Sequence, residues 1–342
     1  MKAMLLGRIG PVAEGSPPLD AADLPIPEPR PGEILLRVSV CGVCHTELDE
    51  IEGRATPPQL PVIPGHQVVG RVERVGADVS SFRTGDRAGV AWIYSACGRC
   101  PQCAAGNENL CPGFRATGRD AQGGYAEYMT VPAAFAYTIP AELADTEAAP
   151  LLCAGAIGYR SLRLTGLGGE GSLGLTGFGA SGHLVLKLVR RRWPKMRVHV
   201  FSRSEAERDF ARQLGAVWAG RSTDIPPEPL DAIIDTTPAW KPVVEALRNL
   251  RPGGRLVINA IRKEDADQQE LLRLRYAEHL WMEKEIKSVA NVTRRDVSEL
   301  LELASQAGLR PAVTEYPLAA ANQALLDLKR GGQPGAKVLR ME

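Results

Sequence analysis

The chain has 342 residues, enough for two domains with separate hydrophobic cores. Apolar residues make up 44%, charged residues 24%, and the formal net charge is +1, so the composition argues against a nucleic-acid footprint, a basic membrane-binding patch and an acidic tail. No segment approaches the roughly 18 apolar residues of a transmembrane helix, and the N-terminus becomes polar too soon for a secretory signal, so we expect a cytoplasmic protein with no nucleic-acid or membrane partner.

Residues 1–153 are rich in glycine and proline and contain short strand-like runs at 33–40, 67–76 and 86–93. Valine, isoleucine and leucine cluster in these runs between turn signals, which predicts a β-domain with long loops. All seven cysteines lie in this part of the chain. An odd number of thiols in a cytoplasmic protein favours metal binding over a disulfide framework.

One group of possible metal ligands is dispersed over CGVCHT (41–46), GH (65–66) and LLCAG (151–155). Taken singly, each is weak, because a lone histidine is often a loop residue and a lone cysteine a buried apolar one. Together, Cys44, His66 and Cys153 supply two sulfurs and one imidazole. Three protein ligands with a fourth position left open are typical of catalytic zinc.

A second group is compact. Two, two and seven residues separate neighbouring members of the set Cys97, Cys100, Cys103 and Cys111. Four sulfurs complete a tetrahedron and leave no open position, which indicates structural rather than catalytic zinc. Four unrelated loop thiols or an iron–sulfur cluster are the alternatives.

From residue 154 strands and helices alternate. Strands are predicted at 172–179, 197–202, 231–237 and 255–261, and helices at 181–192, 204–215 and 241–250. This alternation predicts a doubly wound parallel sheet. A charged helical segment is expected near 262–285, and a further helix at 295–308, before a tail too short for a third domain.

The glycines Gly177, Gly179 and Gly182 form a G-x-G-x-x-G motif between the first predicted strand and its helix. In that context the motif indicates a dinucleotide site, in which backbone approaches the pyrophosphate at a helix N-terminus. A glycine-rich turn without a ligand is the alternative. About 20 residues further on, NAD-binding chains carry an acidic residue. Here Ser202 and Arg203 follow the second strand, which favours the 2′-phosphate of NADP.

These elements, in this order, resemble the zinc-containing medium-chain alcohol dehydrogenases over essentially the whole chain, and the tract SVANVTRRD (288–296) resembles a bacterial subgroup. The resemblance implies an α/β-plus-β fold: a GroES-like catalytic domain with both zinc sites (1–153), a Rossmann nucleotide-binding domain (154–290) and a return to the first domain (291–342). It implies reversible oxidation of a small primary or secondary alcohol to an aldehyde or ketone with NAD(P).

The resemblance also assigns roles to individual residues. Cys44, His66 and Cys153 would bind catalytic zinc, and Cys41 would be a spare thiol. Thr46 would accept the substrate proton, and Trp92 would wall the substrate pocket. His45 and Lys337 would meet the cofactor pyrophosphate.

Three positions depart from the common pattern of the family. Gln67 replaces the glutamate that often follows the zinc-binding histidine, Glu47 replaces an aspartate, and Asp49 replaces a histidine that ends the proton relay. The relay would therefore end at Asp49, at a ribose hydroxyl or in water.

Other functions of the same fold stay open. The chain could be a polyol or amino-alcohol dehydrogenase, or a non-catalytic zinc protein that senses the nicotinamide redox state. A zinc-free quinone reductase is disfavoured, because it would not need Cys44, His66 and Cys153. Relatives in bacteria are often tetramers, so we expect a homo-oligomer, either a tetramer or a dimer.

Overall fold

The computed structural model describes residues 1–331 and 335–341, which form two compact units. Unit 1 is Met1–Cys153 with Val292–Glu342, and unit 2 is Ala154–Asn291. Within the predicted return segment 291–342, residues 332–334 and 342 lie outside the described residues. None of the described helices combines the length and apolar character that a membrane crossing demands.

Unit 1 is built mainly from strands. Its strands are β1 (Lys2–Leu6), β2 (Leu19–Asp23), β3 (Glu33–Val43), β4 (Val68–Val75), β5 (Arg87–Val90), β6 (Ile93–Ser95), β7 (Arg115–Ala116), β8 (Tyr128–Pro132), β9 (Ala136–Thr138), β16 (Val313–Pro317) and β17 (Ala336–Arg340). Its helices are α1 (His45–Ile51), α2 (Pro101–Ala104), α3 (Asp145–Pro150), α9 (Arg294–Gln306) and α10 (Ala321–Arg330). Short 3-10 turns are η1 (Glu108–Leu110), η2 (Ala133–Phe135) and η5 (Leu318–Ala320).

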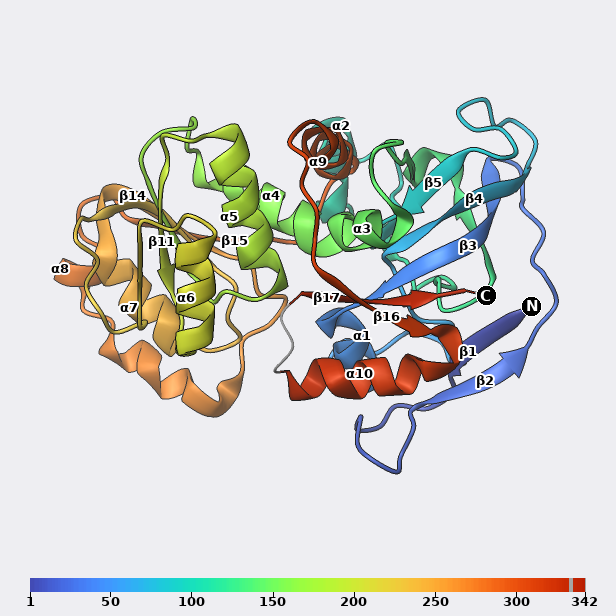
Figure 1. Cartoon of the computed structure of the whole chain (residues 1–342), viewed down its shortest axis with the longest axis horizontal. Helices are drawn as coiled ribbons and strands as arrows, with labels where there is room; N and C mark the ends of the chain where they lie inside the picture. The colour runs from blue at the N-terminus through green and yellow to red at the C-terminus, as the bar shows by residue number, and fades with distance from the viewer. Residues whose placement is uncertain (332–334, 342) are drawn as a thin grey trace. The chain divides into compact units, whose positions relative to one another are not determined.

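The C-terminal segment of the chain completes the unit 1 sheet. The strand order is β16-β17-β3-β4-β5-β9, and β17 lies antiparallel to β3, with Lys337 opposite Val43. Figure 1 shows β16, β17 and α10 beside β3, although these segments lie at opposite ends of the chain. Thr293 and Asp296 form a capping box that starts α9, because each side chain accepts the backbone N–H of the other.

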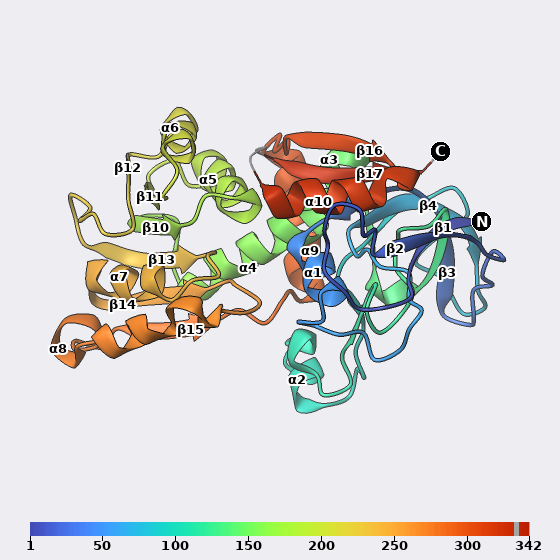
Figure 2. The same ribbon diagram turned by 90° about the horizontal axis from the view of Figure 1, so that it is seen from below.

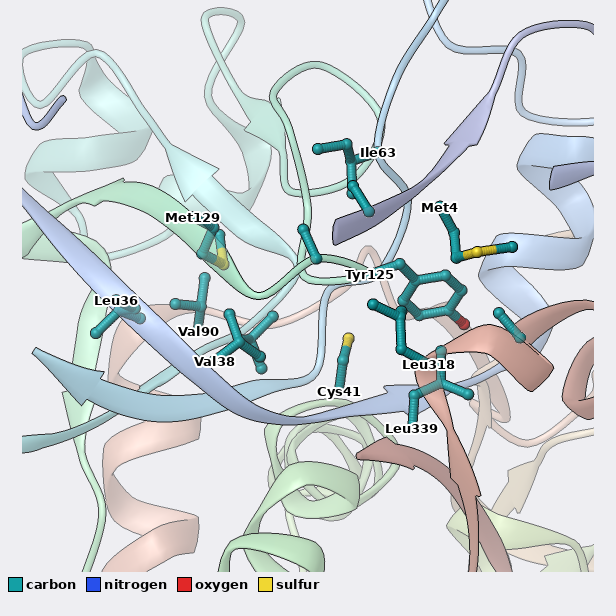
Figure 3. Close-up of a cluster of buried hydrophobic side chains, with 14 of the residues drawn as sticks. Met4, Leu36, Val38, Cys41, Ile63, Val90, Tyr125, Met129, Leu318 and Leu339 are labelled. Atoms are coloured by element: carbon teal, nitrogen blue, oxygen red, sulfur yellow. The ribbon is translucent and has the colours of Figure 1, made fainter. Parts of the chain in front are cut away.

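The core of unit 1 lies between β3, β4 and the segments that cover them. Figure 3 shows the Cys41 sulfur pointing into this cluster, among side chains that include Val38 and Tyr125. Cys41 is fully buried, and burial raises the pKa of its thiol well above the ordinary value. The predicted spare thiol is therefore an apolar core residue in this structure.

Unit 2 carries a parallel sheet with helices packed on it. The elements are α4 (Ala156–Thr165), β10 (Ser172–Thr176), α5 (Ala180–Arg192), β11 (Arg197–Phe201), α6 (Glu205–Gln213), β12 (Trp218–Gly220), β13 (Leu230–Asp235), α7 (Lys241–Asn249), β14 (Leu250–Ile258) and β15 (Glu285–Ser288). The strand order β12-β11-β10-β13-β14-β15 can be followed in Figure 2. Every residue of β10 is buried, as expected of a central parallel strand. The predicted combination of a β-domain with a doubly wound parallel sheet is confirmed.

The segment predicted to be helical near 262–285 differs from expectation. It forms a kinked 3-10 helix, η4 (Asp265–Arg273), and a single α-helical turn, α8 (Tyr276–His279). The backbone of Asp267 is non-helical, with φ −123°, and its carboxylate accepts the N–H groups of Trp240 and Lys241 at 2.9 and 2.8 Å. Capping the first turn of α7 thus takes precedence over the local preference for helix.

Candidate metal centres and cofactor site

The first candidate ligand, Cys44, stands where β3 gives way to α1. It is the N-cap of α1, and its sulfur accepts the backbone N–H of Thr46 at 3.3 Å. Its own N–H donates to the Glu47 carboxylate at 2.8 Å, which completes a capping box. The Thr46 hydroxyl oxygen lies 3.4 Å from the Cys44 sulfur. The residues CHTE therefore fix both the sulfur and the neighbouring hydroxyl by local hydrogen bonds.

His66 reaches the same place from the loop before β4. Gly65 precedes it with φ +99°, and a Cβ there would lie 2.4 Å from the Tyr125 ring and 2.8 Å from the Cys41 sulfur. Only glycine fits this backbone, which brings the fully buried imidazole beneath α1.

The third ligand, Cys153, comes from the π-helical turn Leu151–Gly155. The ligand atoms of Cys44, His66 and Cys153 all lie within 4.8 Å of one another. The distance from the Cys44 sulfur to His66 Nε2 is 3.8 Å. Tetrahedral zinc holds sulfur and nitrogen ligands about 3.6 Å apart, so the three donors fit the ion with one position left open.

A buried carboxylate orients the imidazole. Glu47 Oε1 lies 2.5 Å from His66 Nδ1 in an ion-pair contact, and both side chains are buried. Burial lowers the pKa of His66, but the charges of Glu47 and Cys44 raise it overall. Since Nδ1 faces Glu47, Nε2 is the atom turned toward the sulfur, as in a carboxylate–histidine–metal arrangement.

Without a cation, the surroundings of Cys44 oppose the ionisation of its thiol. The Cys153 side chain, followed by burial, raises the pKa of Cys44 well above its ordinary value. A divalent cation is the group whose charge would offset both effects and hold the two sulfurs as thiolates. The donor chemistry therefore fits the predicted metal.

The compact cysteine group surrounds α2. The sulfurs of Cys97, Cys100, Cys103 and Cys111 also lie within 4.8 Å of one another, and those of Cys97 and Cys103 are 4.0 Å apart. Sulfurs around tetrahedral zinc are separated by about 3.8 Å. Backbone N–H groups point at the sulfurs, two of them at Cys111, at 3.3 Å each. The N–H groups of Arg99 and Cys100 lower the pKa of Cys97 to about 6, which favours thiolate at neutral pH.

Glu50 is a further buried acid close to the three-ligand group, and it was not predicted from the sequence. Its side chain is 1% exposed, and neither carboxylate oxygen has a hydrogen-bond partner among the described residues. Burial, with the charge of Glu47, raises its pKa to about 8, against smaller opposing effects of His66, Trp92 and Arg119. It stands three positions after Glu47, on the same face of α1, and this spacing is the signal that could have identified it.

Gln67 and Asp49, which depart from the family pattern, each contact a neighbouring part of unit 1. Gln67 packs against the backbone of Gly42, where an added Cβ would lie 2.7 Å from the amide oxygen. Asp49 is buried, and its carboxylate accepts Arg54 Nε at 2.5 Å. Asp49 is thus part of an ion pair at the end of α1.

The remaining predicted residues of unit 1 lie around these groups. His45 is exposed on the first turn of α1. Lys337 is 3% exposed and pairs in register with Val43, the residue before Cys44. The ring of Trp92 packs against Phe114 in a tilted arrangement, with ring centres 5.1 Å apart and planes at 41°, and its indole nitrogen is buried.

In unit 2 the glycine motif joins β10 to α5, as predicted. Gly177 has φ +81°, and a Cβ there would lie 2.7 Å from the Thr236 hydroxyl. A Cβ on Gly182 would lie 2.8 Å from the Gly177 carbonyl oxygen. Gly179 is the N-cap of α5 and has open space where its side chain would be. Two glycines therefore allow close packing, and the third leaves the helix N-terminus accessible to an anion.

The end of β11 carries the two residues predicted to select the cofactor. Ser202 is buried and donates to the Glu207 carboxylate, whereas Arg203 is exposed. Arg208, which was not predicted, donates to the carbonyl oxygens of Ser202 and Arg203 at 2.8 and 2.9 Å. Two guanidinium groups and one carboxylate thus lie around this turn.

Comparison with known proteins gives matches over both units. Residues 30–141 match the alcohol dehydrogenase GroES-like domain, and residues 203–339 match the zinc-binding dehydrogenase family. The chain is 44% identical to a probable alcohol dehydrogenase, AdhA, of Mycobacterium tuberculosis (strain CDC 1551 / Oshkosh), over 99% of this chain and 97% of that protein. It is 31% identical to an alcohol dehydrogenase of Geobacillus stearothermophilus, over 95% and 96% of the two chains.

Solved structures agree with these matches. The crystal structure of AibC superposes with a TM-score of 0.89 at 28% identity and covers 100% of this chain and 96% of that one. A structure of an NAD-dependent alcohol dehydrogenase, at 24% identity and a TM-score of 0.86, shares the fold. The chain belongs to the zinc-containing medium-chain alcohol dehydrogenases and is a zinc-dependent oxidoreductase that acts on the CH–OH group of alcohols with a nicotinamide cofactor.

Proposed function

We propose that unit 1 binds two zinc ions with different tasks. The observation that carries this proposal is the difference between the two donor sets, three ligands at Cys44, His66 and Cys153 and four around α2. The three-ligand set leaves room for a substrate oxygen and would be catalytic. The four-sulfur set is closed and would stabilise its loop.

The residues around the three-ligand set divide the work of alcohol oxidation. Zinc bound there would supply a Lewis acid that lowers the pKa of a substrate hydroxyl. Thr46, whose hydroxyl lies 3.4 Å from the Cys44 sulfur, would accept the substrate proton and pass it outward. Glu47 would keep His66 in the orientation that presents Nε2. Trp92 would form an aromatic wall of the substrate pocket.

The glycine motif and its surroundings would hold the dinucleotide. The open N-terminus of α5 at Gly179 suits the pyrophosphate, and His45 and Lys337 are proposed to contact the same group of the cofactor. Hydride transfer is the chemistry of the nicotinamide itself, so the task of the protein is to orient it.

NADP is the favoured cofactor. Arg203 is exposed beside the Ser202 hydroxyl, and the neighbouring Arg208 is held by two backbone carbonyls, so a 2′-phosphate would meet two guanidinium groups. Glu207 opposes this preference because it accepts from Ser202. Arg203→Asp should weaken NADPH binding relative to NADH, and Glu207→Gln should shift the preference the other way. An unchanged preference in both variants would contradict the assignment.

The substrate is proposed to be a small primary or secondary alcohol, or the corresponding aldehyde or ketone. The direct test is a spectrophotometric panel of alcohols, carbonyl compounds and polyols with both nicotinamide cofactors, on protein of measured zinc content. Preference for a polyol over every simple alcohol would replace this substrate class with the polyol alternative.

We also propose that the protein is a cytoplasmic homo-oligomer. The edge strand β15 is exposed at every residue, with Ile286 46% exposed, and Trp281 and Met282 shortly before the strand are 54% and 51% exposed. An unpaired edge with exposed apolar side chains is a natural surface for a second copy of the chain. None of the seven cysteines forms a disulfide, as expected in a reducing compartment. Sedimentation should show a dimer or tetramer that Ile286→Lys weakens, and a monomeric wild type would contradict this proposal.

A further inference from the structure

A buried lysine follows β14 in unit 2 and belongs to neither zinc site nor to the glycine motif. The Lys263 side chain is 8% exposed, and its ammonium group forms an ion pair with the fully buried Asp235. It also donates to the carbonyl oxygens of Thr237 and Ala239, at 2.7 and 3.0 Å. All three ammonium protons therefore have an acceptor within one short turn, residues 235–239.

That turn begins at the carboxyl end of β13. Asp235 is the last residue of the strand, and its carboxylate also accepts the Thr237 hydroxyl at 2.8 Å. Burial raises the pKa of Asp235, and Lys263 opposes this rise, so the carboxylate depends on the lysine for its charge. Lys263 and Asp235 together fix the path of the turn.

The same turn supports the glycine motif directly. The backbone N–H and the hydroxyl of Thr236 both donate to the carbonyl oxygen of Thr176, at 2.9 and 3.0 Å. A Cβ on Gly177 would lie 2.7 Å from the Thr236 hydroxyl and 3.0 Å from the Thr237 methyl. Residues 236 and 237 therefore form the surface against which Gly177 takes its positive φ.

Further hydrogen bonds join the Lys263 segment to the turn. The N–H of Glu264 donates to the Pro238 carbonyl oxygen at 2.8 Å, and Asp267 caps the N–H groups of Trp240 and Lys241. Lys263 also lies 5.9 Å from the centre of the Trp240 ring. Residues 263–267 thus hold residues 236–241 in place, although strand β14 separates the two segments in the sequence.

We infer that Lys263 is a positioning residue for the dinucleotide: through Asp235 and the 235–239 turn, it sets the backbone of Gly177, the first residue of the glycine motif that would hold the pyrophosphate. This inference rests on the proposed dinucleotide role of the glycine motif. A buried ion pair adds little net stability compared with an apolar pair of similar volume. Its value here is geometric, because three directed donors hold a loop that would otherwise have several conformations.

The test measures ligand affinity rather than turnover. Lys263→Met keeps the length of the side chain and removes its three donors. NADPH, NADH and ADP-ribose, which all contain the pyrophosphate, should each bind about tenfold more weakly to this variant. Adenosine 2′-monophosphate, which lacks the pyrophosphate, should bind with unchanged affinity. Fluorescence titration and calorimetry give these constants.

Two further variants separate positioning from stability. Arg255→Met removes another unit 2 ion pair, to Glu285 at 2.7 Å between β14 and β15, and should lower the melting temperature without changing the affinity for NADPH. Thr236→Val leaves the Lys263 ion pair intact but removes the hydroxyl that donates to the Thr176 carbonyl oxygen, next to Gly177, and should reproduce the loss of affinity. This variant carries the test if Lys263→Met does not fold.

The outcomes are distinct. Unchanged NADPH affinity in Lys263→Met or, if that variant does not fold, in Thr236→Val would overturn the inference. A loss of affinity in Arg255→Met as large as in Lys263→Met, or an equal loss for adenosine 2′-monophosphate, would overturn it too, because the effect would not be local to the pyrophosphate. A wild-type protein that binds no dinucleotide would instead overturn the proposed function of the glycine motif.

Discussion

At the scale of single residues, one buried carboxylate, Glu47, contacts the candidate ligands of the three-ligand site. Glu47 both caps α1 through the N–H of Cys44 and contacts His66, so one side chain links two of the three metal ligands. A residue with two such contacts should affect metal binding without touching the metal.

Replacing Glu47 by glutamine tests this link. Glu47→Gln preserves the shape but removes the charge facing His66 Nδ1, and should lower zinc affinity at the three-ligand site by about 10- to 100-fold. Competition with a chromophoric chelator measures this affinity. Glu52→Gln is a matched control, because Glu52 lies just after α1 and contacts Arg54 and Lys329. Equal zinc affinity in both variants would contradict the role of Glu47.

Glu50 makes a separate prediction about pH. Its pKa in the folded protein is raised from 4.5 to about 8, so the folded state holds this proton more tightly than the unfolded state. The contribution of Glu50 to stability therefore becomes less favourable as pH rises from about 4.5 to about 8. Glu50→Gln should stabilise the metal-free protein at pH 8 by about 4 kcal/mol and have little effect near pH 4.5. Urea unfolding at the two pH values measures this, and equal effects at both would show that Glu50 does not titrate in this way.

At the scale of elements, the glycine motif shows how three similar residues serve different needs. Gly177 needs a positive φ and close contact with Thr236, whereas Gly179 has φ −80° and open space around its Cα. The sequence pattern identifies the motif, but only the packing tells which glycine is constrained by the fold and which has open space for the proposed dinucleotide.

The two alanine variants should therefore differ. Gly177→Ala should lower the free energy of unfolding by about 1–3 kcal/mol, because it combines backbone strain with a clash. Gly179→Ala should fold with nearly normal stability and bind NADPH more weakly, since its methyl group would occupy the space left for the pyrophosphate. Thermal melting and NADPH titration on both variants measure the two effects. Weak NADPH binding without loss of stability in Gly177→Ala would contradict the packing argument.

Across the whole molecule, sequence pattern predicted the elements that rely on local rules. The β10–α5 unit can be predicted from local sequence signals alone: a run of apolar residues for the strand, a glycine turn, and a helix that ends at Trp193. Residue type and spacing also pointed to the two candidate groups of metal ligands, whose side chains the structure brings together. The conformation of the segment 262–285 could not be predicted from local signals, because Asp267 leaves helical geometry to cap α7.

Contacts that form only through tertiary packing also could not be predicted from the sequence. The closeness of Glu47 to His66 depends on the loop at Gly65, which brings His66 to α1 from another part of the chain, and the burial of Glu50 likewise depends on tertiary packing. Lys263 reaches Asp235 from 28 residues away along the chain. Contacts between residues so far apart leave no periodic pattern in the sequence. The residues that support a site are therefore harder to predict than its candidate ligands.

The central claim is that one chain carries two metal sites with different tasks. The most direct measurement is zinc content by atomic emission, together with turnover, on the wild type, Cys44→Ser and Cys100→Ser. The account predicts two zinc ions per chain in the wild type. Cys44→Ser should keep the structural ion, fold normally and lose turnover, whereas Cys100→Ser should lose the other ion and melt at a lower temperature. Full turnover in Cys44→Ser, or loss of activity without loss of stability in Cys100→Ser, would contradict it.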